Sequence, residues 1–503
     1  MSVYINWFKN KFTPLQQLLL IGLLARLISV IFSKGFGFFD DHFLIIEASQ
    51  SWVDGFDYNY WLPDKADPTR QAQGHPLFYV WLHYVFFSGL KFCGIFNPQL
   101  KMFLVRLIHA LYSLLLIKYG YKITKQYSNA KVAWYVGLFM ALYWFMPFIC
   151  VRNLAEFVCV PPILISIWLL IKPMPTLKNY VIAGLLFGIA FSMRFQIVFV
   201  LAGIGVALLL YKTKIKSILA IVISFFCLIL LTNGIVDFIL WKKPFAEFIE
   251  YINYNINNAN VYGTNNWHMY FDLIFGLLIP PLSFLIFAGY FYTWKKLPIL
   301  FWPVLIYLAF HTYFPNKQER FILTIFPLLI IAGTIGMFSI YETYKQKFNT
   351  KLLKILMYFV IIINSILFLL LSPSYGKRHL VEASYYFYNK KECNGFFVED
   401  SNKENNFLMP PLFYYGKWFS VCGISKNFNA DSALYYYNYK ASQKPNYVLF
   451  VQTENINARV DTLRKRFPTL TYEATIDASL LDKTLHWLNP LNDNQTAYIY
   501  KIK

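Results

Sequence analysis

Long apolar runs recur along the chain between residues 15 and 371, and short polar segments separate them. A helix needs roughly 20 apolar residues to cross the hydrocarbon core of a bilayer, and the runs have about that length. The pattern predicts membrane-spanning helices at 15–33, 101–119, 131–149, 156–172, 180–194, 195–211, 216–236, 271–293, 298–314, 320–340 and 351–371. We therefore expect a polytopic α-helical membrane protein with about eleven transmembrane helices.

Composition excludes a soluble globular enzyme. Of the 503 residues, 57% are hydrophobic and only 14% are charged. About 25% charged residues is usual for a soluble domain. The chain is therefore expected to be integral to a membrane.

The net charge of +20 is explained by where the lysines lie. Several short polar segments are rich in lysine and nearly free of acids, for example the one with Lys118, Lys122 and Lys125. The positive-inside rule places such segments in the cytoplasm, so the charge does not require nucleic acid as a partner. Counting the run 76–95 as a span would put every later lysine cluster outside. We interpret it as a re-entrant or interfacial helix within a first outer loop at 34–100.

The character of the chain changes after Ser372, where apolar runs shorten and Asn, Asp, Lys and Tyr become frequent. Tyr447–Val451 is typical of a buried strand. We expect a catalytic transmembrane domain at 1–372 and a C-terminal α/β domain at 373–503, outside the membrane because the number of crossings is odd. Cys393 and Cys422 in this domain form either a disulfide or two free thiols.

An acidic cluster follows the first predicted span, with Asp40, Asp41, His42 and Glu47 beside an apolar helix face. Partial burial there would raise the proton affinity of a carboxylate toward that of a general base. The alternative is a solvated loop in which Asp40 or Asp41 caps the next helix. Spacing alone leaves both interpretations open.

Other polar residues also fall at the outer ends of the predicted spans. They are Arg70, His75, Arg152, Glu156, Arg194, Gln196, Asp237, Lys317, Glu319 and Arg320. Each by itself is more often a snorkelling charge or an intramembrane ion pair than a ligand. Together they supply cations and carboxylates to one outward-facing cavity. Arg26 lies inside the first span, and we expect it to form an internal ion pair with Glu156.

Three stretches resemble motifs of the GT-C superfamily of glycosyltransferases, and within it glycosyltransferase family 22, the polyprenyl-phosphate-mannose-dependent mannosyltransferases. Residues 40–47 are similar to the family's HPDE…E motif, although Phe38 and Phe39 replace its His and Pro. Residues 254–270 resemble its YN…YG…PWHWY stretch, with Asn266 in place of Pro. Residues 316–322 resemble HKExRF. The resemblance covers about residues 15–340.

The resemblance implies a GT-C fold and inverting transfer of a hexose, with mannose the expected sugar, from a polyprenyl-phosphate donor to a glycan or glycolipid hydroxyl. Asp40 then matches the catalytic Asp of the HPDE motif and Asp41 its Glu, and both are candidate catalytic residues. A departing phosphate needs fixed cations, for which the candidates are Arg320, Arg194 and Lys317, with His268 as a further hydrogen-bond donor to the phosphate. Candidate substrate-binding residues are Glu47, Arg70, His75, Glu156, Tyr262, Trp267 and Glu319. Asp40, Asp41 and Glu47 have the oxygen chemistry to bind Mg²⁺ or Mn²⁺, but the resemblance implies that no metal is required.

Two alternatives remain, a lipid or saccharide transporter and an inactive homologue. Pro161-Pro162 and Pro280-Pro281 interrupt predicted spans, and broken helices are common in transporters. However, the polar residues gather at the outer ends of the spans, whereas a transporter binds its substrate near the midplane of the bilayer. The composition is typical of an AT-rich bacterial genome. We therefore expect a bacterial inner-membrane protein with its site facing the periplasm, or the ER lumen if the source is eukaryotic.

Overall fold

The computed structural model describes residues 11–261, 264–404, 408–418, 421–437, 444–489 and 496–502. The chain forms two compact units, and each is described by itself. The helical unit comprises Met1–Val30, Tyr60–Leu82 and Val105–Ser372. The sheet unit comprises Ile31–Asn59, His83–Leu104 and Pro373–Lys503.

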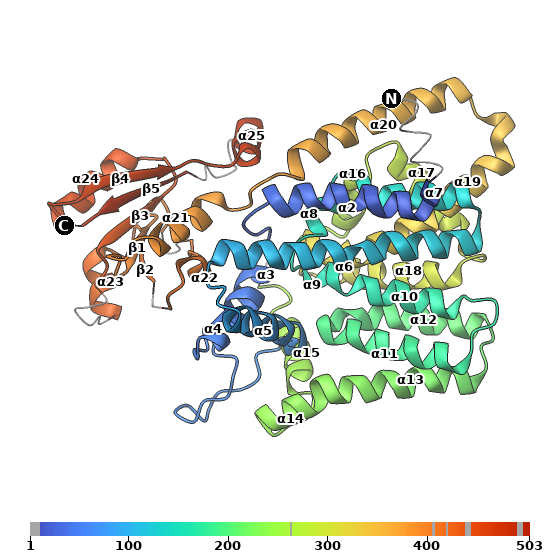
Figure 1. The fold of residues 1–503 in the computed structure, drawn as a ribbon, viewed down its shortest axis with the longest axis horizontal. Helices are drawn as coiled ribbons and strands as arrows, with labels where there is room; N and C mark the ends of the chain where they lie inside the picture. The colour runs from blue at the N-terminus through green and yellow to red at the C-terminus, as the bar shows by residue number, and fades with distance from the viewer. Residues whose placement is uncertain are drawn as a thin grey trace. The chain divides into compact units, whose positions relative to one another are not determined.

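The helical unit is a bundle of apolar helices (Figure 1). Its α-helices, some of which begin or end in the sheet unit, are α2 (Pro14–Phe32), α5 (Leu77–Phe92), α6 (Pro98–Tyr127), α7 (Ala130–Leu142), α8 (Met146–Ile149), α9 (Ala155–Val158), α10 (Val160–Leu170), α11 (Leu177–Met193), α12 (Val198–Leu210), α13 (Ile215–Ile229), α14 (Ile235–Trp241), α15 (Ala246–Asn257), α16 (Met269–Leu277), α17 (Leu282–Tyr292), α18 (Pro298–Tyr313), α19 (Phe326–Tyr344) and α20 (Thr350–Leu371). Short non-α turns are η2 (Phe195–Ile197), η3 (Leu230–Gly234), η4 (Glu319–Ile325) and η5 (Lys345–Lys347).

Five of the described helical stretches are long and apolar enough to cross a membrane: Pro14–Phe32, Pro98–Tyr127, Ile215–Trp241, Glu319–Lys347 and Thr350–Leu371. A sixth is added if α16 and α17, which bend by 115° at their junction, count as one broken span. The other predicted spans correspond to shorter apolar helices, and so does the predicted interfacial run, which is α5. A polytopic helical membrane protein is confirmed, and the number of about eleven crossings stays a prediction.

Burial differs sharply among these spans. In the most apolar 18-residue window of Glu319–Lys347, 83% of the residues are buried within the protein, whereas in that of Thr350–Leu371 only 6% are. An apolar helix that is exposed along its whole length is stable in lipid and not in water. The exposed apolar surface of α20 is therefore typical of a span that faces lipid.

Arg26 is fully buried in α2, and its contacts in the described part of the chain are hydroxyl, carbonyl and thiol groups and no carboxylate. Its Nε donates to Ser113 Oγ at 2.8 Å, and its NH2 group donates to the carbonyl of Met140 at 3.1 Å and contacts Cys150 Sγ at 3.2 Å. Hydrogen bonds to oxygens and a sulfur thus compensate for its lost hydration. The expected ion pair between Arg26 and Glu156 is wrong, because Glu156 pairs with other arginines.

The sheet unit contains a five-stranded sheet in the order β2-β1-β3-β5-β4. Its strands are β1 (Phe396–Glu399), β2 (Cys422–Ile424), β3 (Tyr447–Val451), β4 (Thr471–Ile476) and β5 (Ala497–Lys501). Strand β1 pairs in parallel with β2 and β3, while β5 is antiparallel to β3 and β4. The predicted buried strand at Tyr447–Val451 is confirmed as the central β3, which is buried on both faces.

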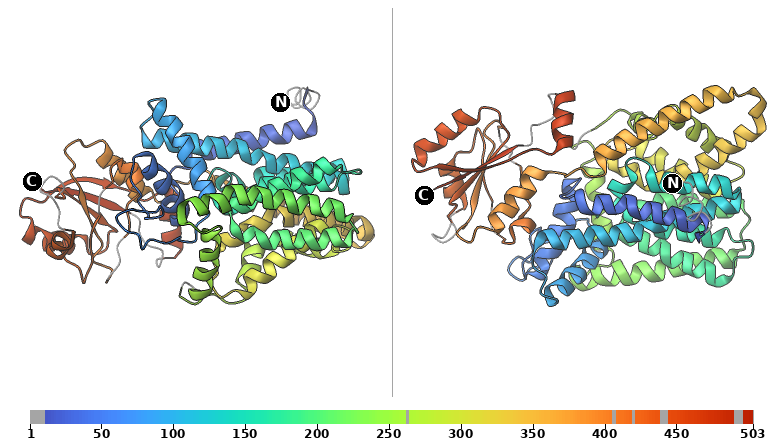
Figure 2. Two further views of the ribbon diagram at one scale, coloured as in Figure 1. Left: turned by 90° about the horizontal axis from the view of Figure 1, so that it is seen from below. Right: turned by 45° about the horizontal axis from the view of Figure 1, so that its top comes forward.

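Helices cover both faces of this sheet (Figure 2). One core joins alternate strand residues to α21 (Arg378–Tyr388) and α22 (Leu412–Tyr415), and the other joins the intervening ones to α23 (Ala430–Tyr437) and α24 (Ile456–Arg466). Cys393 and Cys422 are buried free thiols in these cores. The last helix is α25 (Leu480–Leu488).

The segment after α2 belongs to the sheet unit. It folds as one turn of α3 (Phe39–Asp41), a π-helix η1 (His42–Glu47) and α4 (Ala48–Val53). π-Helical turns are rare and occur frequently at functional sites.

Candidate active site

Two arginines converge on one buried carboxylate in the helical unit. Glu156 Oε1 lies 2.6 Å from NH1 of Arg194 and 3.5 Å from Nε of Arg320. The Glu156 side chain is 2% exposed, and the two arginine side chains are 12% and 10% exposed. Two guanidinium groups and one carboxylate leave an excess of positive charge in a site largely shielded from water.

Breaks between helices bring these three residues together. Glu156 is in the first turn of α9, Arg194 is the extended residue between α11 and η2, and Arg320 lies in the 3₁₀ turn η4 that precedes α19. Thr324 Oγ1 donates to the backbone carbonyl of Glu156 at 2.7 Å, which ties η4 to α9. Phe321 lies against both guanidinium groups, 5.5 Å and 5.8 Å from their central carbons.

Two glutamine amides hold the arginines in place. Gln196 Oε1 accepts a hydrogen bond from Arg194, and Gln318 Oε1 accepts one from Nε of Arg320 at 2.9 Å. Each glutamine lies two positions from the arginine that it contacts, so the local sequence spacing helps to orient each guanidinium group. Planar guanidinium groups held in this way suit bidentate recognition of a phosphate.

The other two family-like stretches meet at this end of the bundle. Thr264 pairs with Asn316 in an isolated backbone bridge, and Asn265 donates to the carbonyl of Lys317 at 3.3 Å. Lys317 is 5% exposed and donates to the carbonyl of Phe314, and burial lowers the pKa of its ammonium group. Residues 52 positions apart in the sequence are thus held together beside the arginine cluster.

The remaining candidates in these stretches lie on the surface. His268 is half exposed and contacts Asp272 at 2.6 Å, Trp267 is 67% exposed, and Glu319 is exposed. Tyr262 lies outside the described residues. Substrate roles for these four residues stay predictions.

Arg70 and His75 take part in the fold of the loop before α5. Arg70 contacts Asp64 at 3.2 Å and Asp67 at 3.7 Å, and its guanidinium lies 4.8 Å from the Tyr60 ring. The His75 ring stacks on Trp61 with 4.2 Å between ring centroids. A role in substrate binding for either residue stays a prediction.

Glu247 fixes the end of this loop. Its Oε2 accepts hydrogen bonds from the backbone amides of Gln73, Gly74 and His75 at 3.1, 2.7 and 3.0 Å. Successive amides that converge in this way form a concave anion site. Gly74 has φ +80° and a Cβ there would lie 2.9 Å from the backbone of Tyr251, so only glycine fits. Burial raises the pKa of Glu247 to about 7, although the amides of His75 and Gly74 oppose the shift.

The acidic cluster lies in the sheet unit. Asp40 is exposed, whereas Asp41 is 8% exposed, so the expected partial burial falls on Asp41. Asp41 precedes the π-helix η1 and makes no side-chain capping hydrogen bond to it. The capping alternative for Asp41 therefore has no support in this structure.

His42 and Glu47 form a fully buried pair at the two ends of η1. His42 Nε2 lies 3.2 Å from Glu47 Oε1, which also accepts from the backbone amide of Phe413 at 2.9 Å. The His42 ring is stacked between the rings of Phe36 and Tyr414, with centroid distances of 4.6 and 5.5 Å. The pair thus attaches the acidic segment to α22.

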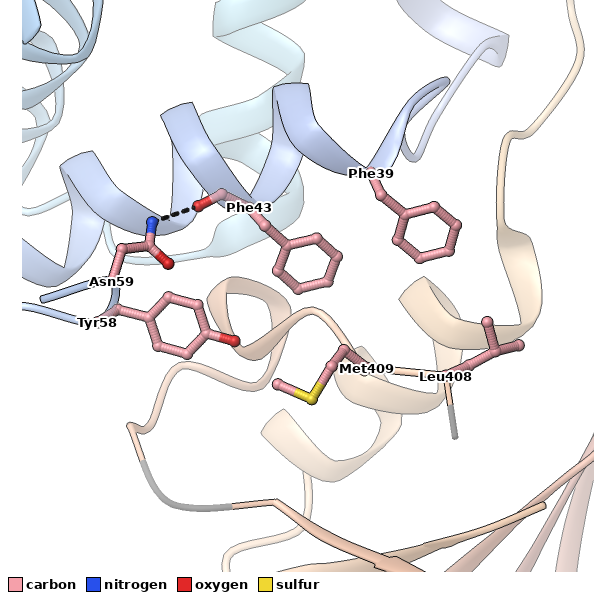
Figure 3. A pocket seen from close by; sticks show the side chains of 6 residues that line it. All are labelled: Phe39, Phe43, Tyr58, Asn59, Leu408 and Met409. Atoms are coloured by element: carbon pink, nitrogen blue, oxygen red, sulfur yellow. Dashed lines mark hydrogen bonds between the residues drawn. The ribbon is translucent and has the colours of Figure 1, made fainter. Parts of the chain in front are cut away.

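A pocket of about 470 Å³ opens within the same unit, and one of its lining residues, Phe39, precedes Asp40 in the sequence (Figure 3). It is lined by Phe39, Phe43, Tyr58, Asn59, Leu408 and Met409. The rings of Phe39 and Phe43 point into it from one side of the helical segment, and Asn59 donates to the Phe43 carbonyl at 2.9 Å. Aromatic faces combined with a phenol and an amide are typical of surfaces that bind sugar rings.

Comparison with known proteins identifies the family. The model of the Alg9-like mannosyltransferase family matches residues 17–419. This chain belongs to that family. The predicted relationship to glycosyltransferase family 22 is confirmed. The prediction that the protein is a glycosyltransferase is confirmed with it.

Two curated relatives illustrate the similarity. A Dol-P-Man:Man(7)GlcNAc(2)-PP-Dol alpha-1,6-mannosyltransferase of Arabidopsis thaliana is 28% identical over 45% of this chain and 45% of its own length. A GPI mannosyltransferase 3 of Debaryomyces hansenii is 24% identical over 81% of this chain and 74% of its own length. The match thus spans less than half of the first relative.

A solved structure shows the fold. ArnT from Cupriavidus metallidurans bound to undecaprenyl phosphate superimposes with a TM-score of 0.55 over 96% of this chain and 97% of its own, at 11% identity. At that identity the likeness concerns the fold alone, and it agrees with the GT-C fold that the resemblance implies.

Sequence reasoning missed Glu247, Tyr58 and the aromatic lining of the pocket. No local pattern links Glu247 to the three backbone amides that lie 172 to 174 positions earlier in the chain. Among the described residues, no group of three His, Cys, Asp or Glu side chains is arranged to hold a metal ion.

Proposed function

We propose that this protein is an inverting glycosyltransferase that moves a hexose, with mannose the first candidate, from a polyprenyl-phosphate-linked donor to a hydroxyl group of a glycan or glycolipid. The buried cluster of Arg194, Glu156 and Arg320 carries the proposal. A phosphate joined to a long lipid needs fixed positive charge in a water-poor setting, and this cluster has a surplus of it. Membership in a family of mannosyltransferases supports the same chemistry.

The residues have distinct proposed roles. Asp40 accepts the proton of the acceptor hydroxyl. The hydroxyl oxygen bonds to the anomeric carbon, and the bond from that carbon to the phosphate oxygen breaks. Arg194 and Arg320 stabilise the phosphate that departs with the lipid, with Lys317 as a further positive charge and His268 as a further hydrogen-bond donor. Asp41, the buried carboxylate next to Asp40 in the sequence, is the second candidate catalytic residue.

The aromatic pocket is our candidate for the acceptor side. Its lining residue Phe39 is the sequence neighbour of the exposed Asp40, and Tyr58 and Asn59 offer polar groups among Phe39, Phe43, Leu408 and Met409. A sugar ring presents apolar C–H faces and polar edges, which matches this lining. Glu47, buried and bonded to His42 and Phe413, supports the segment and does not face the acceptor in this proposal.

The membrane arrangement proposed here has about eleven crossings with residues 1–372 as the catalytic domain and 373–503 outside the membrane. Lysine-rich segments then lie in the cytoplasm and the acidic loop lies outside. For a bacterial source this means the inner membrane with the site facing the periplasm and an undecaprenyl carrier. No metal is needed for the roles assigned above.

The decisive experiment is transfer by purified full-length protein in detergent. Radiolabelled polyprenyl-phosphate mannose is the donor, and an envelope glycolipid and glycan fraction from the source supplies the acceptor. We expect Asp40→Asn to reduce transfer by about 10²-fold or more, as loss of a general base does. The matched control is Glu342→Gln, an exposed carboxylate on α19 that pairs with Lys345. Equal transfer by the wild type and Asp40→Asn would remove Asp40 from this role, and inactive but folded wild type would favour the transporter or inactive-homologue alternatives.

A further inference from the structure

Helix α25 of the sheet unit is amphipathic, and its apolar side is largely exposed. None of its residues is buried, and Leu480, Trp487 and Leu488 are 74%, 79% and 65% exposed. The helix is nevertheless well defined at its start, where Ser479 Oγ accepts a hydrogen bond from the amide of Asp482. In Figure 1 it stands clear of the five strands.

The apolar residues form one side of the helix. At 100° per residue, Leu480, Leu481, Leu485 and Leu488 fall on one side together with Thr484, and Trp487 flanks them. Asp482, Lys483 and His486 fall on the opposite side. This division is typical of a helix that lies at the boundary between an apolar and an aqueous phase.

The cores of the sheet unit do not include this helix. Neither of the two core clusters in the described residues has a member from α25. A helix of nine residues is marginal in water without packing, so its apolar side needs a partner surface.

We propose that α25 lies in the bilayer–water interface and holds the C-terminal domain against the lipid headgroups. The domain follows α20 directly in the chain, since α20 ends only a few residues before α21 begins. Helix α20 is long and apolar enough to cross a membrane, and its apolar surface is exposed. The domain is therefore tethered beside a bilayer. Leucine and tryptophan on one side of a helix, with charged residues on the other, match the acyl and headgroup layers of that bilayer.

A protein partner fits this helix less well. Stable protein–protein interfaces bury about 1,200–2,000 Å² in total, and one side of a nine-residue helix supplies only a small part of that area. A bilayer needs no matching shape and binds such a helix through burial of apolar area alone. The proposal concerns attachment to lipid and does not depend on the proposed sugar transfer.

The test uses the full-length protein in nanodiscs of phosphatidylcholine. Cys93 and Cys227, the exposed native cysteines, are first replaced by serine. An environment-sensitive fluorophore is then attached at Leu488→Cys on the apolar side or at Lys483→Cys on the polar side of the same helix. Both positions are exposed, so the labels do not disturb a core.

We expect nitroxide-labelled lipid to quench the fluorophore at 488 at least about twofold more than at 483, since such helices sink about 5–10 Å into the interface. Aqueous iodide should quench in the reverse order. Equal quenching at both positions by iodide, with none above background by the nitroxide lipid, would show that α25 lies in water and overturn the proposal. Protection of position 488 from both quenchers would overturn it in favour of a protein partner.

Discussion

The carboxylate of Glu47 accepts a hydrogen bond from the backbone amide of Phe413, a residue 366 positions later in the chain, at 2.9 Å. The same oxygen contacts His42, and both side chains are fully buried. This contact attaches the segment with Asp40 and Asp41 to the C-terminal α22. Helix α22 in turn packs into the core of the sheet unit.

Removing the Glu47 carboxylate should weaken this attachment. Glu47→Ala leaves the buried Phe413 amide without its acceptor, which costs about 1–3 kcal/mol of folding free energy. Glu47→Gln keeps an acceptor oxygen and should lose less. Thermal unfolding of both variants in detergent measures the difference. If Glu47→Ala unfolds at the wild-type temperature, the contact contributes nothing to stability.

Replacing Arg320 by lysine should impair donor use specifically. Lysine keeps the positive charge but loses the planar fork and the hydrogen bond from Nε to Gln318. We expect kcat/KM for the polyprenyl-phosphate donor to fall by about 10²-fold, as for loss of a preorganised donor to a developing charge. Initial rates at varied donor concentration measure it. Arg464→Lys, a surface arginine on α24 paired with Asp461, is the matched control and should behave as the wild type.

Stability should fall as the pH rises through neutrality because of Glu247. Burial raises its pKa from an ordinary value of 4.5 to about 7, so the folded state favours the protonated form. That contribution is fully present below about pH 4.5 and is lost as the pH rises through about 7. Asp237, which accepts from the Glu247 amide, and the nearby His75 share this environment.

Unfolding temperatures measured between pH 4.5 and 8 check this expectation. Glu247→Gln removes the titrating group and should flatten that part of the profile. Glu250→Gln on the same helix α15 is the control, and its profile should retain the wild-type slope. A profile of Glu247→Gln parallel to that of the wild type would assign the pH dependence to other groups.

Enlarging the aromatic pocket should affect the acceptor and not the donor. Phe43→Ala removes a ring that points into the pocket beside Phe39. Loss of a stacking surface worth about 0.5–1.5 kcal/mol should raise the acceptor KM several-fold. The donor KM should stay unchanged. A rise in the donor KM alone would place the lipid donor, and not the acceptor, in this pocket.

Several features followed from the sequence because they depend on local physical constraints. A bilayer requires long apolar helices, so the runs from 15 to 371 were sufficient to predict a polytopic protein. The stretches at 40–47, 254–270 and 316–322 were sufficient to indicate the family, since short motifs keep their order along the chain. The strand at Tyr447–Val451 was predictable because it is buried on both faces and reads as a continuous apolar run.

The pairing of polar groups was decided only by the tertiary structure. The sequence suggested Arg26 as the partner of Glu156, yet Glu156 meets Arg194 and Arg320 because three helix breaks meet at one place. Glu247 meets Gln73 to His75, and Glu47 meets Phe413, across separations that no local pattern encodes. Helix periodicity determines which residues are apolar, whereas a hydrogen bond or ion pair requires atoms within a few ångströms. That proximity depends on how the helices pack and not on the order of the residues.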